Sequence, residues 1–312
     1  MTPRVSIGLP VYNGERFLPT AIDTILAQDF GDFELIIADN ASTDRTGEIA
    51  AKYAARDERI SIHSSDVNRG AAWNFNRCVH LARGHYFKWV AHDDELEPIW
   101  LSRCVQVMDN EPDVVLCYSR TLQIDADGAV IRELPSWSAR DESPRRRASR
   151  ALLSMGNATA MFGLTRRVEL LRTRLERSYG ASDRALIAQL ALMGKLHEVP
   201  QFLFRNREYN ERSGGAVQDR RMRDAFVDPT RNARWSVPRW QLLGGYTWAF
   251  VTAPVPFQTR AAGLSLLPKW ILRQKGNLAY DFVRLFKPLD RSAAIDRSGE
   301  RGGVGARRGF ER

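Results

Sequence analysis

Residues 4–119 alternate between short β-rich runs and segments with helical periodicity, and this alternation constrains the fold more than any other feature. Runs rich in β-branched and aromatic residues predict strands at Val5–Val11 and at residues 33–38, 60–63, 86–91 and 114–118. Between them, apolar residues recur at the spacing of amphipathic helices. The pattern predicts an α/β fold: a mostly parallel sheet with flanking helices on both faces. In such sheets, ligands bind beyond the carboxyl ends of the strands.

The later part of the chain continues the alternation with clear punctuation. Gly84 is predicted to end the third helix as a left-handed cap, and residues 125–128 (DADG) predict a turn. Residues 135–150 are polar and arginine-rich, which favours a loop. After an apolar segment at 158–164, a helix carries Leu186, Ile187, Leu190 and Met193 and ends at Gly194, and Val199-Pro200 begins the next segment.

The region after residue 240 has two interpretations. Residues 240–259 carry no formal charge over a length close to that of a membrane helix, but Gly244, Gly245, Pro254 and Pro256 make a straight span doubtful. The next stretch mixes leucines and aromatics with Lys269, Arg273, Lys275, Arg284 and Lys287. That composition suits a helix lying on an anionic membrane surface, and equally suits helices packed on the preceding domain with a basic outer face.

The formal net charge of +9, from 46 Lys and Arg against 37 Asp and Glu, favours an anionic partner. Arginine clusters at 145–147, 220–221 and 307–308 are scattered and do not interleave with aromatics, so we expect no nucleic-acid partner. The three cysteines form neither a metal-binding spacing nor a disulfide framework. Together with an N-terminus that lacks a secretory apolar segment, they predict a cytoplasmic protein.

Polar clusters follow three of the predicted strands. Residues 12–15 (YNGE) follow the first strand, Asp39 and Asn40 follow the second, and residues 92–94 (HDD) follow the run at 86–91. Parallel strands would bring these ends to one edge, where Asp39, Asp93 and Asp94 share a crevice. Like charges at such short range need a counter-ion, and Mg²⁺ or Mn²⁺ carrying a substrate diphosphate would supply it. Solvated turn residues or helix caps are the alternative for either pair alone.

Four segments together resemble a known family. They are VSIGLPVYNGERFLPTAIDTILAQ, FELIIADNASTDRTGEIA, NRGAAWNFNRCVHLARGHYFKWVAHDDELEP and GASDRALIAQLALMGKLHEVP. In this order and spacing they are similar to the family 2 inverting glycosyltransferases with the GT-A fold, over about residues 4–215. The resemblance implies a GT-A, Rossmann-like sheet. It also implies transfer of a hexosyl or deoxyhexosyl group from a nucleotide-diphospho-sugar, most simply a UDP- or dTDP-sugar, to a hydroxyl acceptor.

The resemblance also assigns roles to individual residues. It implies binding of the nucleotide-sugar by Pro10, Val11, Tyr12, Asp39, Asn68, Arg69 and Asp93. Asp94 would be the direct ligand of Mg²⁺ or Mn²⁺, with His92 as a second ligand or a support. Asp183 matches the catalytic base, although an Asp at a helix start is also a common N-cap.

Three departures from the family pattern bear on these roles. His92 and Ser182 stand where many members carry Asp and Glu, and the segment FLFRNREYNERSGG lacks the usual histidine. Arg207 or Arg212 is expected to bind phosphate in its place.

The sequence therefore predicts three regions: a catalytic domain at 1–215, a helical region at 216–288 that contacts a membrane surface or packs on the domain, and a disordered tail at 289–312. The expected acceptor is a surface polysaccharide or a lipid-linked glycan, at the inner face of the cell membrane. The alternative is a catalytically inactive GT-A-like protein that binds a nucleotide-sugar or a membrane surface. A sugar-1-phosphate nucleotidyltransferase would need a Gly-rich loop after the first strand, which PVYN is not.

Overall fold

The computed structural model describes residues 2–208 and 237–284, which build one nine-stranded mixed sheet in the order β3-β2-β1-β4-β8-β6-β9-β5, with β7 paired to β6. The strands are β1 (Val5–Val11), β2 (Phe33–Asp39), β3 (Ile60–Ser64), β4 (Tyr86–Trp89), β5 (Glu95–Leu96), β6 (Val114–Ile124), β7 (Val130–Glu133), β8 (Leu164–Arg166) and β9 (Lys195–Arg207). The neighbours β3-β2-β1-β4 are parallel, and β8 runs antiparallel to both β4 and β6. The predicted α/β class is confirmed.

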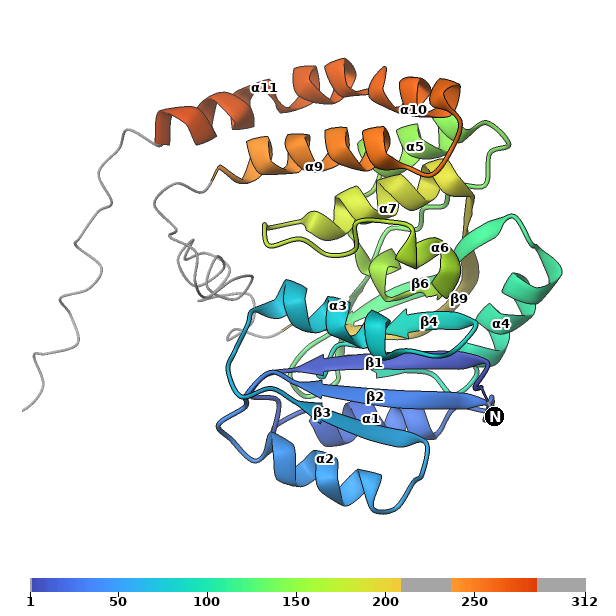
Figure 1. Ribbon diagram of the computed structural model, residues 1–312, viewed down its shortest axis with the longest axis vertical. Coiled ribbons are helices and arrows are strands. Elements are labelled where there is room, and N and C mark those ends of the chain that lie inside the picture. The colour runs from blue at the N-terminus through green and yellow to red at the C-terminus, as the bar shows by residue number, and fades with distance from the viewer. Residues whose placement is uncertain (1, 209–236, 285–312) are drawn as a thin grey trace, which may run out of the picture.

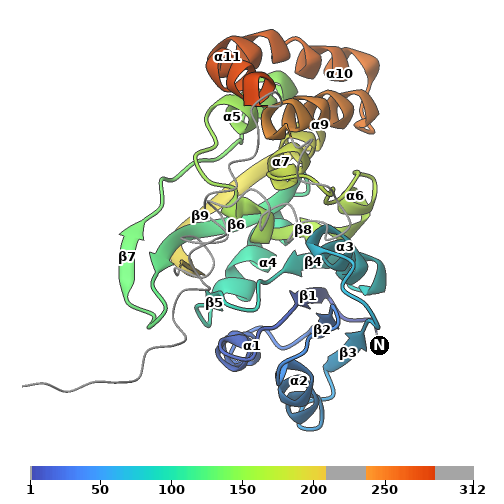
Figure 2. The same ribbon diagram turned by 90° about the vertical axis from the view of Figure 1, so that its left-hand side faces the viewer.

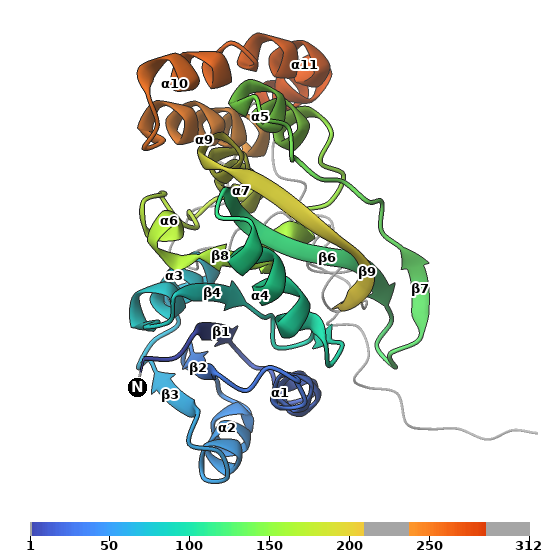
Figure 3. The same ribbon diagram turned by 90° about the vertical axis from the view of Figure 1, so that its right-hand side faces the viewer.

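Helices cover both faces of this sheet. They are α1 (Leu18–Leu26), α2 (Thr46–Ala54), α3 (Ala71–Leu81), α4 (Trp100–Asn110), α5 (Pro144–Leu153), the 3-10 turn η1 (Thr159–Phe162), α6 (Arg167–Leu171), α7 (Ser182–Met193), α9 (Pro238–Thr252), α10 (Phe257–Leu264) and α11 (Leu267–Arg284). Figures 2 and 3 show α1, α2 and α4 on one side of the sheet and α3 on the other. Every residue of β1 and β2 is buried, because both faces of these strands are covered.

Several boundaries differ from those predicted. The strand expected to run to residue 91 ends at Trp89, and the one expected to end at residue 118 continues to Ile124. Within the predicted loop 135–150, α5 begins at Pro144 and buries Ala148, Ala151, Leu152 and even Arg147. The Arg147 guanidinium donates to the carbonyl oxygens of Ala191 and Leu192, so an arginine-rich stretch that reads as loop caps the end of α7.

Two predicted boundaries of secondary-structure elements were wrong. Gly84 is not a left-handed cap, because Gly70 and Gly128 are the glycines with positive φ in the described chain. Gly84 instead lies against β1, where a Cβ atom would come 2.6 Å from the backbone nitrogen of Ser6. Pro200 does not begin a segment: β9 starts at Lys195 and runs through it. The ladder with β6 is irregular at that point, which accommodates a residue that has no N–H to donate.

The helices α9 and α10 pack on α7 and α5, and α11 packs on α9, so that all three join the core of α5 and α7 (Figure 1). Leu242, Tyr246, Phe250 and Trp270 belong to the same buried cluster as Leu186 of α7. In the described ranges, no helix combines the length and the apolar character that crossing a membrane requires. The predicted tail at 289–312 lies outside the described residues.

Candidate active site

The carboxyl ends of β2, β1 and β4 lie side by side, as their order requires. Asp39 is paired with Val11 across β2 and β1, and Trp89 with Gly8 across β4 and β1. Neighbouring strands are about 4.8 Å apart, so β2 and β4, on either side of β1, are about 10 Å apart across the sheet. The described residues contain no group of three or more His, Cys, Asp or Glu side chains placed to hold one metal ion. Asp39 and the β4 acids therefore share an edge without forming one ligand set.

The loops after β1 and β2 are tied to each other. Asn13, with φ of 51°, accepts the Thr43 N–H through its side-chain oxygen at 2.8 Å and donates its own N–H to the Ser42 hydroxyl. The Asp39 Oδ1 accepts both the N–H and the hydroxyl of Ser42, at 3.0 and 2.5 Å. Tyr12, which begins the loop after β1, is 43% exposed. A buried carboxylate and an exposed aromatic ring thus stand together on a fixed loop pair.

Asn40 joins three loops at this edge. Its N–H donates to the Val11 carbonyl oxygen, and its side-chain amide donates to Asn68 at 2.8 Å. The Asn40 Oδ1 accepts the Arg69 N–H at 3.0 Å. The Arg69 guanidinium lies over the Trp73 ring, 5.0 Å from its centroid. The structure therefore brings Asn68 and Arg69 to the same edge as Val11. Asn40, which the sequence offered only as a neighbour of Asp39, holds them there.

The two acids after β4 are buried. Asp93 is 2% exposed and Asp94 is 0% exposed. The Asp94 Oδ1 accepts the Arg207 N–H and the Asn206 side-chain amide, each at 3.0 Å. His92 is half-buried, and its ring lies against Gly14, where a Cβ atom would come within 2.8 Å of it. The end of β9 therefore orients the Asp94 carboxylate.

Arg207 has a different role from the phosphate binding expected of it. Arg207 is 3% exposed, and its Nε donates to the Asp93 carbonyl oxygen at 2.9 Å. It also pairs with Glu95 and donates to the carbonyl oxygens of Asp125 and Ala126. Arg207 thus supports the segment that contains Asp93 and Asp94, the acid motif. Arg212 lies outside the described residues.

Lys88 lies within β4, close to the acid motif, and is fully buried. Its Nζ donates to the Phe162 carbonyl oxygen and lies 3.8 Å from the centroid of the Trp100 ring. Burial lowers its pKa to about 7, with Cys104 and Asp94 acting in the opposite direction. The lysine supplies a titratable charge in the protein interior near Asp94.

Asp183 is the second residue of α7 and is not its N-cap, because Ala181 occupies that position with φ of 66°. The half-buried carboxylate accepts the Arg184 N–H at 2.8 Å. Burial raises the pKa of Asp183, whereas that N–H and the Arg184 charge oppose the increase. The first turn of a helix also favours the charged form of a carboxylate.

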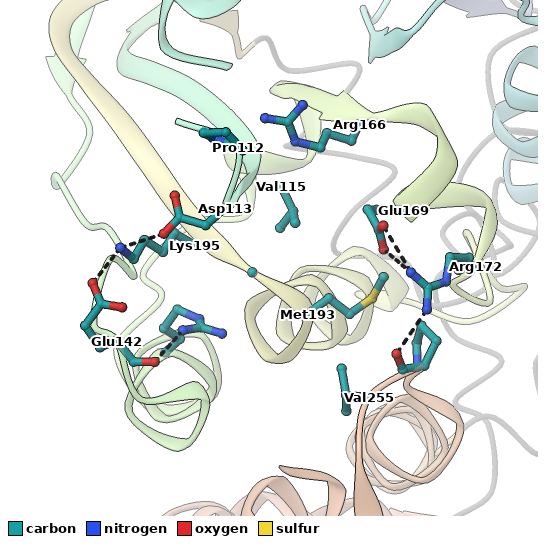
Figure 4. A pocket seen from close by; sticks show the side chains of 13 residues that line it. Pro112, Asp113, Val115, Glu142, Arg166, Glu169, Arg172, Met193, Lys195 and Val255 are labelled. Atoms are coloured by element: carbon teal, nitrogen blue, oxygen red, sulfur yellow. Dashed lines mark hydrogen bonds and ion pairs between the residues drawn. The ribbon is translucent and has the colours of Figure 1, made fainter. Parts of the chain in front are cut away.

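A cavity of about 330 Å³ lies at the other end of the sheet (Figure 4). It is bounded by Asp113 and Val115 at the start of β6, Lys195 at the start of β9, and Met193 at the end of α7. Since β6 runs in the same direction as β4, these are amino ends of strands. Lys195 pairs there with Asp113 and Glu142, and Arg172 with Glu169. This cavity contains none of the predicted site residues.

Comparison with known proteins adds the family. The profile described as Glycosyl transferase family 2 matches residues 6–170. The uncharacterized glycosyltransferase EpsJ of Bacillus subtilis is 39% identical over 118 residues, which are 38% of this chain and 34% of EpsJ. The chondroitin synthase of Pasteurella multocida is 30% identical over 135 residues, covering 43% of this chain and 14% of the synthase. The matched part thus spans about a third or less of these relatives.

Solved structures agree on the fold. The S. aureus TarS 1-349 structure in complex with UDP superposes with a TM-score of 0.65 and 15% identity, over 94% of this chain and 77% of that one. The mannosyltransferase PcManGT from Pyrobaculum calidifontis, in complex with GDP-Man and Mn²⁺, gives a TM-score of 0.50 and 17% identity, over 91% and 86%. At these identities the likeness shows the fold alone. With the profile covering more than half of the residues, the chain belongs to glycosyl transferase family 2 and has the GT-A fold.

Proposed function

We propose that this protein transfers a sugar from a nucleotide-diphospho-sugar to a hydroxyl acceptor, with inversion at the anomeric carbon. The observation that carries the proposal is the shared edge of β2, β1 and β4, where Tyr12, Asp39 and the Asp93-Asp94 pair follow adjacent strands. Family membership supports it, as do the similar folds of TarS, solved with UDP and UDP-GlcNAc, and PcManGT, solved with GDP-Man.

The nucleotide would bind across the loops after β1 and β2. Pro10 and Val11 form the strand end beneath it, and the exposed Tyr12 ring offers a face for stacking on the base. The Asp39 carboxylate would accept hydrogen bonds from the base. Asn68 and Arg69, held by Asn40, would line the far side, where the guanidinium can meet a phosphate. A UDP- or dTDP-sugar is the proposed donor.

The side chains at the end of β4 are oxygen and nitrogen ligands that suit a hard divalent cation, Mg²⁺ or Mn²⁺. Such ions take one or two carboxylates and complete their shell with water and substrate phosphates, so a cluster of three protein ligands is not required. Asp94 would be the ligand, oriented by the N–H groups at the end of β9, with His92 beside it and Asp93 toward the sugar. When bound, the cation would neutralise charge on the departing diphosphate.

The base in this proposal is Asp183. Its ionised carboxylate takes the proton of the acceptor hydroxyl while the acceptor oxygen forms a bond to the anomeric carbon. The bond from that carbon to the diphosphate breaks on the opposite face, and the bonding pair leaves with the nucleotide. The products are the glycoside and a nucleoside diphosphate, and the proton remains on Asp183 until solvent removes it.

We further propose that the protein acts at an anionic membrane surface, the inner face of the cell membrane. The proposed acceptor is a surface polysaccharide or a lipid-linked glycan. The outer faces of α9–α11 expose apolar side chains, namely Trp240, Trp248, Val251, Phe257, Ile271, Leu272, Tyr280, Phe282 and Val283. Lys269, Arg273 and Lys275 are exposed on the same long helix, α11. Aromatic and apolar groups mixed with cations are what an anionic interface binds.

Co-sedimentation with phosphatidylglycerol vesicles tests this surface. Leu272→Asp, at a side chain that is 69% exposed, should reduce the bound fraction several-fold without changing the fold, whereas Val67→Asp, at 55% exposure in another part of the chain, should not. Equal binding by both variants, or binding that is insensitive to salt, would contradict the membrane assignment. A deletion of α9–α11 would be uninformative because these helices share the core of α7.

Thermal unfolding with UDP, dTDP, GDP and CMP, each with and without Mn²⁺, tests the donor site. A ligand at about a hundred times its dissociation constant stabilises the fold by about 2.7 kcal/mol. The shift should need Mn²⁺ and disappear in Asp94→Ala, while Asp127→Ala, at an exposed turn acid, should retain it.

Turnover of the selected donor should then fall by about 10²–10⁴-fold in Asp183→Asn. No shift with any pair of nucleotide and metal, or a shift without turnover, would favour the catalytically inactive binding protein.

A further inference from the structure

A buried carboxyl group accompanies the half-buried Asp183 carboxylate. Glu176 lies in the loop between α6 and α7 and is 7% exposed. Its Oε2 accepts the hydroxyl hydrogen of Ser182, the residue that precedes Asp183 and begins α7. Its Oε1 is buried and accepts no hydrogen bond from the described part of the chain. A carboxyl group is therefore fixed at the start of α7, the helix that carries Asp183. One of its two oxygen atoms has no hydrogen-bond donor among the described residues.

The loop is built to hold Glu176 in this place. Its N–H donates to the Asn76 side-chain oxygen and its carbonyl oxygen accepts from the Asn76 amide, both at 2.9 Å, which clamps the residue to α3. Leu175 and Ala181, on either side of the segment, have positive φ values of 53° and 66°. Such conformations are unfavourable for residues with a side chain, so the surrounding structure enforces them.

The charges around the two carboxyl groups are unequal. Asp183 has the Arg184 N–H and the Arg184 charge to stabilise its ionised form. The influences on Glu176 are burial and the Asp183 charge, which raise its pKa to about 8, and the Ser182 hydroxyl, which opposes them. In the described part of the chain, other titratable groups near the pair are Tyr179, whose pKa Arg174 and Arg177 lower, and Tyr246 of α9, whose pKa Arg239 lowers. These arginines are not among the influences on the pKa of Glu176.

We propose that Glu176 is a positioning residue for the base: it carries the single proton that the two carboxyl groups hold at neutral pH, and thereby leaves Asp183 as the charged member. This inference rests on the proposed role of Asp183. During transfer the acceptor proton moves to Asp183 while Glu176 keeps its own, and Asp183 then releases its proton to solvent. Above about pH 8, Glu176 loses its proton and two negative charges stand at the start of α7. Repulsion between the two carboxylates should then displace Asp183 from the position in which it takes the acceptor proton, so the doubly ionised form should be inactive and turnover should fall.

The test compares pH profiles of donor turnover, once the donor is known from nucleotide screening. Wild type should lose activity above about pH 8, about tenfold per pH unit. Glu176→Gln imitates the protonated acid, so it should keep turnover within about threefold at pH 7 and lose the alkaline decline. Ser182→Ala removes the hydrogen bond that favours the ionised Glu176, so its decline should move to higher pH. The matched control is Glu198→Gln, another Glu that accepts a serine hydroxyl, which should retain the wild-type profile.

A measurement without turnover tests the proton itself. Because the folded protein holds the Glu176 proton up to about pH 8 and an unfolded Glu loses it near 4.5, the wild-type unfolding temperature should fall relative to Glu176→Gln across that range and level off above it. A flat difference, or an alkaline decline in Glu176→Gln equal to that of wild type, would overturn the inference. Full turnover by Asp183→Asn would instead overturn the proposed base, while the Glu176 stability difference would remain.

Discussion

Replacing Lys88 with Met should change how stability depends on pH. Lys88 is fully buried, and its pKa falls from 10.5 to about 7 in the folded protein, equivalent to about 5 kcal/mol as an upper bound. Between pH 7 and 10.5 the unfolded chain binds the proton that the folded chain has lost, so stability rises with pH in this range and is lowest below pH 7. Met has similar length and no charge, so Lys88→Met should lack this rise.

The size of the effect follows from the same values. From pH 7 to pH 9, wild type should gain about 2–3 kcal/mol of unfolding free energy relative to Lys88→Met. The hydrogen bond to the Phe162 carbonyl oxygen and the contact with Trp100 are lost in the variant, which lowers its stability by about 1–3 kcal/mol at every pH. The slope against pH therefore reports the buried charge, and the offset reports the contacts.

Urea unfolding of both proteins at several pH values between 6 and 9.5 measures this slope. Lys52→Met is the matched control, because Lys52 is exposed on α2 and should give a curve parallel to that of wild type. If wild type and Lys88→Met also run parallel, Lys88 is charged in the fold up to high pH, and the reasoning from burial fails.

Two further substitutions probe the support of the acid motif. Arg207→Met should cost about 3–5 kcal/mol in urea unfolding, because Glu95 keeps only Arg205, at 3.6 Å, and three carbonyl oxygens lose the donor that Arg207 supplies. A cost below about 1 kcal/mol would contradict the supporting role. Gly14→Ala should cost about 1–3 kcal/mol and weaken nucleotide binding in calorimetry, because its methyl group would meet the His92 ring. In the control Gly47→Ala, the methyl group meets open space within α2, so stability should stay equal or rise by up to about 1 kcal/mol; equal losses in both variants would refute the packing argument.

The sequence predicted those parts of the fold in which burial and periodicity coincide. The strand Val5–Val11 was predicted with its observed ends, because every residue in it is buried and the loop begins at once. The later half of β6 was missed because Arg120 and Gln123 interrupt the apolar pattern, although pairing with β9 continues to Ile124. There the ladder decides the conformation, and composition does not reveal a partner 80 residues away.

The same limit applies to the site. Acids after apolar strands were visible because their position in the chain is informative. Glu176 gave no such signal: it is one acid in a loop, and its meaning depends on Asn76, a hundred residues earlier, and on Ser182. Arg207 was expected to bind phosphate because its neighbours resemble a family segment, whereas its burial behind Asp93 follows from the end of β9, which no local pattern predicts.

The irregular pairing of β9 with β6 indicates where residues can be inserted into or deleted from this strand. One end of this strand leaves α7 at Gly194, where a Cβ atom would come 2.3 Å from Val115, and the other end meets Asp94 through Arg207. An insertion near either end would turn alternate side chains to the opposite face of the sheet. Around Pro200 the register with β6 already shifts, so an added or lost residue can be absorbed. Insertions and deletions within β9 should therefore gather at residues 199–202.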